Sequence, residues 1–154
     1  MNQLSPSSVS LLLFLAFAIF VIPFIFYSMT LQKTLKAIAP ENRKMNPSQI
    51  WFLFIPLFGI IWHFIIVTKL SDSIKAESLD RTIELKESRP GFYIGIATCI
   101  FNCTSILPKI FGIISSITSI AFIICWIIYW AKIASYKKQI LNSSMITLDA
   151  ELQG

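Results

Sequence analysis

Charged side chains are scarce in this chain, and the first of them appears late. Only 14% of the 154 residues are Asp, Glu, Lys or Arg, whereas a soluble domain usually has about 25%. No charged side chain precedes Lys33, and hydrophobic residues make up 55% of the composition. Long apolar runs without charge are typical of segments that cross a bilayer. The composition therefore predicts an integral membrane protein.

The sequence also lacks the motifs of common enzyme and nucleic-acid-binding classes. It has only five glycines, and it contains no phosphate-binding loop, dinucleotide fingerprint, GxSxG or HExxH pattern. The net charge of +5 arises from Lys and Arg residues that flank apolar segments, not from a continuous basic patch. We therefore expect no enzymatic activity and no nucleic-acid binding.

The three cysteines all lie inside apolar segments, and an odd number so placed does not indicate a disulfide framework. Together with His63, the residue types of Cys99, Cys103 and Cys125 suit zinc. No closely spaced Cys–His pair of the zinc-ribbon kind is present, however. We expect no metal site and no cofactor.

Four apolar segments divide the chain, at about residues 9–31, 50–68, 91–107 and 110–131. At 1.5 Å per helical residue, each reaches or approaches the roughly 30 Å thickness of a hydrocarbon core. A polar connection at residues 69–90 separates two helical hairpins, and the tail at residues 145–154 is expected to be mobile. The predicted fold is all-α, a single membrane domain over residues 1–154 with four hydrophobic helices.

The second segment is interrupted by Pro56 and Gly59. A proline removes one helical hydrogen bond and bends the helix, which membrane helices tolerate. We therefore predict a second helix that is kinked at Pro56 and spans the membrane. The alternative is a re-entrant segment that bends at Pro56 and Gly59 and returns to the side from which it entered.

The two arrangements distribute the positive charges differently. With four spans, eight Lys and Arg residues share a side with the C-terminus and five lie opposite. Because cytoplasmic loops are enriched in positive charge, this count favours a cell (inner) membrane protein with both termini in the cytoplasm. With a re-entrant second segment the count becomes twelve against one, and only Lys109 lies on the opposite side.

Small residues recur every four positions in the third segment and reappear in the fourth. Such spacing lets helix backbones approach closely in lipid. It predicts tight pairing within this hairpin or with another chain. The helix-packing residues are Gly91, Gly95, Cys99 and Cys103 in the third segment, with Gly112 and Ser116 in the fourth.

Two polar residues within the apolar segments form a candidate intramembrane site. His63 is the only ionisable side chain well inside a segment, and such groups are functional candidates by default. Asn102 belongs to a polar stripe with Thr98 and Ser105. The alternative for His63 is a structural role, in which a neutral imidazole donates one hydrogen bond to another helix.

One stretch resembles a known family. The sequence reads PENRKMNP at residues 40–47, followed by Trp51, by IPLF at residues 55–58 and by Trp62. Over about residues 31–80 this resembles a family of small, uncharacterised multi-pass membrane proteins from bacteria. The resemblance implies a bacterial membrane protein and implies no activity.

The function predicted from these features is a structural or interaction role. The chain would be a subunit or an oligomer in the lipid bilayer, in contact with a second copy or another membrane protein. The alternative is a small oligomeric channel or transporter that uses the kinked second helix with His63 and Asn102.

Overall fold

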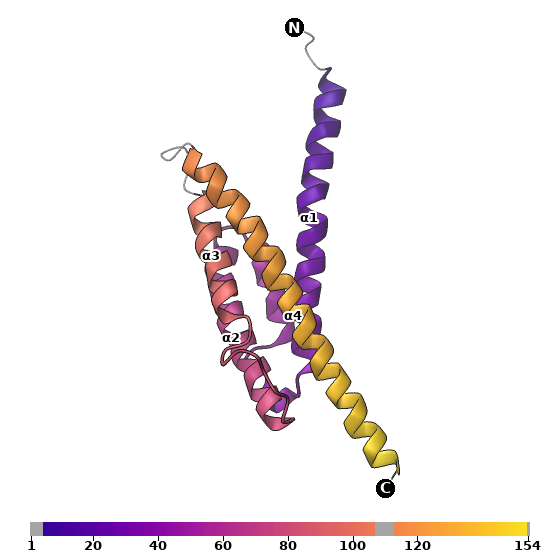
Figure 1. Ribbon diagram of the computed structural model, residues 1–154. Helices are drawn as coiled ribbons and strands as arrows, with labels where there is room; N and C mark the ends of the chain where they lie inside the picture. Colours follow the sequence, from indigo (N-terminus) through magenta and orange to yellow (C-terminus); the bar gives the residue numbers. More distant parts are fainter. Residues whose placement is uncertain (1–4, 107–112, 154) are drawn as a thin grey trace.

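The computed structural model describes residues 5–106 and 113–153, which form helices and no strands. The all-α prediction is confirmed for this part of the chain. Figure 1 shows α3 and α4 as a long hairpin, with the N-terminal half of α1 standing apart from both. In chain order the elements are α1 (Pro6–Ala37), the 3₁₀-helices η1 (Pro40–Asn42) and η2 (Pro47–Phe54), α2 (Phe58–Asp80), α3 (Phe92–Ile106) and α4 (Ile113–Gln153).

Helix α1 is longer than the first predicted segment. Its N-cap is Ser5, whose side chain accepts the backbone N–H of Ser8, which satisfies one of the free donors at a helix start. Pro23 lies inside the helix. The 32 residues extend for about 48 Å at 1.5 Å per residue, more than the thickness of a hydrocarbon core.

The segment at residues 50–68 is a hairpin, which corrects the predicted single helix kinked at Pro56. η2 ends at Phe54, and α2 begins at Phe58 after Leu57, whose φ of 61° is unusual for a leucine. The indole N–H of Trp62 donates to the carbonyl of Gln49 at 2.8 Å. The two arms therefore run antiparallel, and the first turns of α2 run back alongside η2.

The arms touch most closely at Gly59. A Cβ atom on this residue would lie 2.3 Å from the carbonyl oxygen of Leu53, far inside van der Waals contact. Only a residue without a side chain permits this approach of two backbones. Gly59 is thus the position at which the sequence allows the chain to reverse rather than to bend.

Because the chain reverses, both polar connections lie at the same end of the molecule. The backbone N–H of Ala39 donates to Glu77 near the end of α2, and that of Lys44 donates to Ser73. At the same end Lys132 of α4 pairs with Glu87 of the second connection. An ion pair also joins Arg89, which follows α2 in the chain, to Asp72 of α2 at 3.1 Å.

Helix α3 packs against the first half of α4, and the second half of α4 extends beyond it. α4 has 41 residues and continues through the tail that was expected to be mobile, as far as Gln153. Two stretches, Ser7–Ala37 and Ser116–Ile146, are long and apolar enough to cross a membrane. α3 contains a shorter apolar stretch, Phe92–Thr104. In the most apolar window, α1 has no buried residue and α4 has 11% of its residues buried.

Candidate functional site

The predicted site residue His63 lies in the core, next to an aromatic residue of α1. Its Nε2 is 2.7 Å from the hydroxyl of Tyr27, and both side chains are buried, at 5% and 0% exposure. Rings from α4 surround this pair: the Tyr27 ring centroid lies 5.3 Å from that of Trp126 and 6.3 Å from that of Tyr129. Three helices therefore position one histidine.

His63 and Asn102 line a common cavity of about 120 Å³. The bend between η2 and α2 forms another part of its wall, through Ile55, Pro56 and Leu57. The two polar residues that the sequence singled out separately are thus brought together, although they come from α2 and α3. We call this space the tip cavity, because it lies at the tip of the hairpin.

The small residues of α3 face the inside of the chain. Gly95 and Cys99 are buried, and a Cβ atom on Gly95 would lie 2.6 Å from a methyl group of Val67 and 2.8 Å from the ring of Tyr129. Gly91, with a φ of 68°, also lies against the Tyr129 ring. The close approach therefore joins α3 to α2 and α4 within one molecule.

The other predicted packing residues lie elsewhere. Cys103 is half-buried and Ser116 is exposed, while Gly112 lies outside the described residues. On α4, the residues that lie against Gly91 and Gly95 are the large side chains of Tyr129 and Ile133. Small residues on one helix thus face large ones on the other.

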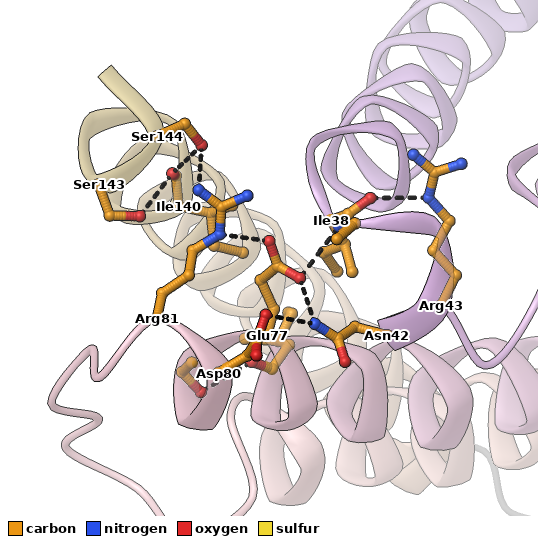
Figure 2. A network of polar contacts seen from close by, with 12 residues as sticks. Ile38, Asn42, Arg43, Glu77, Asp80, Arg81, Ile140, Ser143 and Ser144 are labelled. Carbon is orange, nitrogen blue, oxygen red and sulfur yellow. Dashed lines mark hydrogen bonds and ion pairs between the residues drawn. The ribbon is translucent and has the colours of Figure 1, made fainter. Parts of the chain in front are cut away.

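A buried carboxylate, not identified from the sequence, joins three segments at the polar end of the molecule (Figure 2). Glu77 has no exposed side-chain surface. Its oxygens accept the backbone N–H of Ala39 at 3.0 Å, the amide of Asn42 at 2.8 Å and the guanidinium of Arg81 at 2.5 Å. Arg81 in turn donates to the hydroxyl of Ser144 on α4 at 2.6 Å. Because Ala39 and Asn42 belong to the first connection, Glu77 to α2 and Ser144 to α4, the network fixes the first connection against these two helices.

Arg43 supports the same connection from its other side. It donates to the carbonyl of Ile38 at 2.8 Å and to that of Lys36 at 3.0 Å. These two carbonyls lie at the end of α1, where helical carbonyls have no partner within the helix. Arg43 therefore caps α1, rather than pairing with an acidic neighbour.

One signal in the sequence points to Glu77. It follows Leu70 and Ile74 by seven and three residues, so a helix places all three on one face. The structure buries that face completely. A carboxylate on an apolar helical face needs partners from elsewhere in the chain, but the sequence does not say which residues supply them.

Within the described part of the chain, no group of three or more His, Cys, Asp and Glu residues is arranged to hold a metal ion. The polar groups of the tip cavity are suited to hydrogen bonding. Comparison of the whole chain with protein-family models, curated proteins and solved structures finds no match. The predicted family resemblance thus stays a prediction, and the function has to be argued from the geometry.

Proposed function

We propose that the chain is a multi-pass protein of the bacterial cell membrane, in which η2 and the first turns of α2 form a re-entrant hairpin. The supporting observation is the separation of charge from exposed apolar surface. Among the side chains that the structure describes, every charged one belongs to the end of the molecule that holds the two connections and the second half of α4. Large apolar side chains such as Leu13, Phe20 and Ile120 are exposed on the rest of the surface.

The dimensions of the hairpin agree with insertion to the middle of a bilayer. The part of α2 from its start at Phe58 to its first charged residue, Lys69, is about 17 Å long at 1.5 Å per residue. The eight residues of η2 rise by about 16 Å at 2.0 Å per residue. Both arms therefore reach about half of the roughly 30 Å hydrocarbon core.

This arrangement also removes the ambiguity of orientation. When the second segment is re-entrant, α1, α3 and α4 are the elements that cross the membrane. Twelve of the 13 Lys and Arg residues then lie on one side, and this side is the cytoplasm. The C-terminus is cytoplasmic and the N-terminus is outside, in place of the two cytoplasmic termini expected for four spans.

Within the membrane the protein has a structural or interaction role, with a second copy of the chain as its partner. The space beside the small residues of α3 is already occupied by Val67 and Tyr129, so self-association requires another surface. The end of α4 offers one, which we call the C-terminal arm (residues 141–153). Leu141, Met145 and Leu152 on this arm are 45%, 63% and 77% exposed.

Apolar residues on the arm follow coiled-coil spacing. Leu141, Met145, Leu148 and Leu152 are separated by four, three and four residues, which places them on one stripe of a helix. A seam of this kind is complementary to an identical seam. Copies inserted in the same orientation present their arms in parallel, and tethering to one membrane raises their effective concentration.

Two experiments test these proposals separately. For membrane insertion, the chain should stay in the membrane pellet after alkaline extraction and require detergent for release. A monodisperse, folded protein in buffer without detergent would refute insertion.

For self-association, light scattering in detergent should give a dimer or larger oligomer that Met145→Lys dissociates. Ile146→Lys is the control, because Ile146 is 71% exposed but lies off the stripe. A monomeric wild type, or equal effects of the two variants, would refute the arm as the interface.

A second candidate function is a small channel or transporter, and the tip cavity favours it. Intramembrane polar residues and broken helices mark the binding sites of many transporters, and His63, Asn102 and the bend share one cavity. Flux into liposomes that is lost in His63→Ala would support this function. Absence of flux for all ions and small solutes tried would reject it.

A further inference from the structure

We infer that an anionic phospholipid of the cytoplasmic leaflet binds where α1 and α4 cross, with its phosphate at Lys33 and Lys137 and an acyl chain in an apolar groove between the two helices. This inference rests on the proposed membrane insertion. It is supported by three features that follow one another along the crossing: the groove, a hydrogen bond that joins the helices, and two lysines without partners.

A hydrogen bond between side chains fixes the crossing point. The indole N–H of Trp130 on α4 donates to the hydroxyl of Thr30 on α1 at 2.9 Å. Figure 1 shows both helices running in the same direction through this point and separating toward their N-terminal ends. Under the proposed insertion, residues before Thr30 and Trp130 therefore lie deeper in the membrane, and residues after them lie toward the cytoplasm.

The apolar groove lies on the membrane side of the crossing. It has a volume of about 370 Å³, and its walls include Phe20 and Pro23 of α1 with Ile123 and Trp126 of α4. Pro23 and Ile123 each precede one partner of the hydrogen bond by seven residues, so they lie on the same helix faces as that bond. Along α1, Pro23 is about 15 Å from Lys33 at 1.5 Å per residue, which is about half of a hydrocarbon core. The groove is thus at the depth that an acyl chain of the cytoplasmic leaflet occupies.

The two lysines lie on the cytoplasmic side of the crossing. Lys33 follows Thr30 by three residues, which places both on one face of α1. Lys137 follows Trp130 by seven residues and shares its face of α4. Within the described residues, neither lysine ammonium has a hydrogen-bonding or ion-pair partner. Their charge is also not balanced along the helices, because α1 has no acidic residue and the first one on α4 is Asp149.

The surface beside these lysines has room for a headgroup. A hollow of about 650 Å³ includes Ala134, Lys137 and Lys138 in its wall. A lysine ammonium binds phosphate as a point charge, and basic residues between helices on the cytoplasmic side are typical of sites for anionic lipids. The order of apolar groove, indole and cations matches the order of acyl chain, glycerol region and phosphate in a phospholipid. An anionic lipid is favoured because a zwitterionic headgroup carries its own cation.

Lipid-dependent stabilisation of the full-length protein in detergent tests the inference. The probes are phosphatidylglycerol and phosphatidylcholine with identical acyl chains, and glycerol 3-phosphate, which has the phosphate without the chains. Binding is measured as the rise in the midpoint of thermal unfolding with the concentration of each probe. We expect phosphatidylglycerol to raise the midpoint at lower concentrations than phosphatidylcholine, and glycerol 3-phosphate to leave it unchanged.

Substitution of the lysines locates the headgroup. Lys33→Gln and Lys137→Gln should each weaken the binding of phosphatidylglycerol by about 5-fold, and together by about 25-fold, from the usual contribution of a lysine at an anionic surface. The matched control combines Lys69→Gln with Lys75→Gln, at two exposed positions of α2, and should bind like the wild type. The midpoint without lipid shows that each variant is folded.

Substitution in the groove locates the acyl chain. Ile123→Trp, which fills the groove, should weaken the binding of phosphatidylglycerol. Its control is Ile124→Trp, because Ile124 is 52% exposed and does not line the groove. Equal effects of these two variants would overturn the placement of the chain.

The other outcomes are equally decisive. Equal losses from the two pairs of lysines would reduce binding to a general attraction of positive charge and overturn the site. Equal stabilisation by both lipids, or by glycerol 3-phosphate, would overturn recognition of an anionic phospholipid. A wild type that requires detergent but gains no stability from phosphatidylglycerol would overturn the inference and leave membrane insertion standing. Solubility without detergent would instead overturn insertion itself, so the two failures are distinguishable.

Discussion

Substitution of Gly59 by alanine distinguishes a reversing chain from a kinked helix by the sign of its effect on stability. The added Cβ would lie 2.3 Å from the carbonyl oxygen of Leu53 and 3.0 Å from its carbonyl carbon. Both are backbone atoms, so no side-chain rotation relieves the overlap. The two arms of the hairpin must separate to accommodate one methyl group.

The magnitude follows from two opposing contributions. Overpacking of a close contact costs about 1–3 kcal/mol. Alanine is favoured over glycine within a helix by about 1 kcal/mol, and by less in the first turn, where Gly59 lies. We expect a net destabilisation of about 1–2 kcal/mol, which lowers the midpoint of thermal unfolding by roughly 2–8 °C for a chain of this length.

The assay is thermal unfolding in detergent, followed by far-ultraviolet circular dichroism. Ile61→Ala is the control, since this exposed residue should change stability by no more than about 0.5 kcal/mol. In a continuous kinked helix, Gly59→Ala would remove a flexible residue and stabilise the protein by about 0.5–1 kcal/mol. A higher midpoint for Gly59→Ala would therefore refute the hairpin.

Three further predictions concern the packing of α3, the buried network and the polar end. Gly95→Ala should destabilise the fold by about 1–3 kcal/mol. Because the added methyl group would overlap the Val67 side chain, Val67→Ala should partly restore stability in a double-mutant cycle. Additive effects of the two substitutions would contradict that contact. Glu77→Ala should lower the free energy of unfolding, measured by chemical denaturation, by about 3–5 kcal/mol. The control Glu84→Ala, at an exposed position, should lower it by less than about 0.5 kcal/mol. Equal losses in the two variants would contradict burial of the network. The pKa of Glu87 is lowered from 4.5, chiefly by the hydrogen bond from a lysine of α4. Its ionised form therefore stabilises the fold above about pH 4.5, and that stability is lost as the pH falls through the lowered pKa. In Glu87→Gln, the midpoint of thermal unfolding should depend less on pH in this window. An unchanged pH dependence would count against the ion pair.

The reversal at residues 55–59 shows where sequence reasoning stops. Pro56 and Gly59 indicate an interruption, and a re-entrant bend was one of the two arrangements that they allowed. A proline specifies which helical hydrogen bond is lost, but not whether the chain continues or turns back. That choice depends on contacts such as Trp62 with Gln49, which join positions far apart in the sequence.

Glu77 illustrates a second limit. Its spacing from Leu70 and Ile74 predicts a shared face, yet its burial depends on partners from other segments. Asn42 and Ala39 reach it only because the first connection folds back against α2. Residue periodicity is a local property, whereas satisfaction of a buried charge is a property of the whole fold.

The small residues of α3 were identified from the sequence, but their contacts were not. Spacing shows that Gly91 and Gly95 share a helix face and permit close approach. It does not show that the approaching groups are Val67 and Tyr129 rather than glycines of another chain. The size of the residue is visible in the sequence, and the identity of its neighbour is not.

The side on which the two polar connections lie tests the re-entrant arrangement most directly. Single cysteines are placed in a cysteine-free background at Glu41, in the first connection, and at Ser88, in the second; both positions are exposed. Labelling with a membrane-impermeant maleimide is compared in intact cells and after permeabilisation. We predict that both cysteines are protected in intact cells and that both are labelled once the membrane is opened. Labelling of one but not the other in intact cells would place the connections on opposite sides and contradict the re-entrant hairpin.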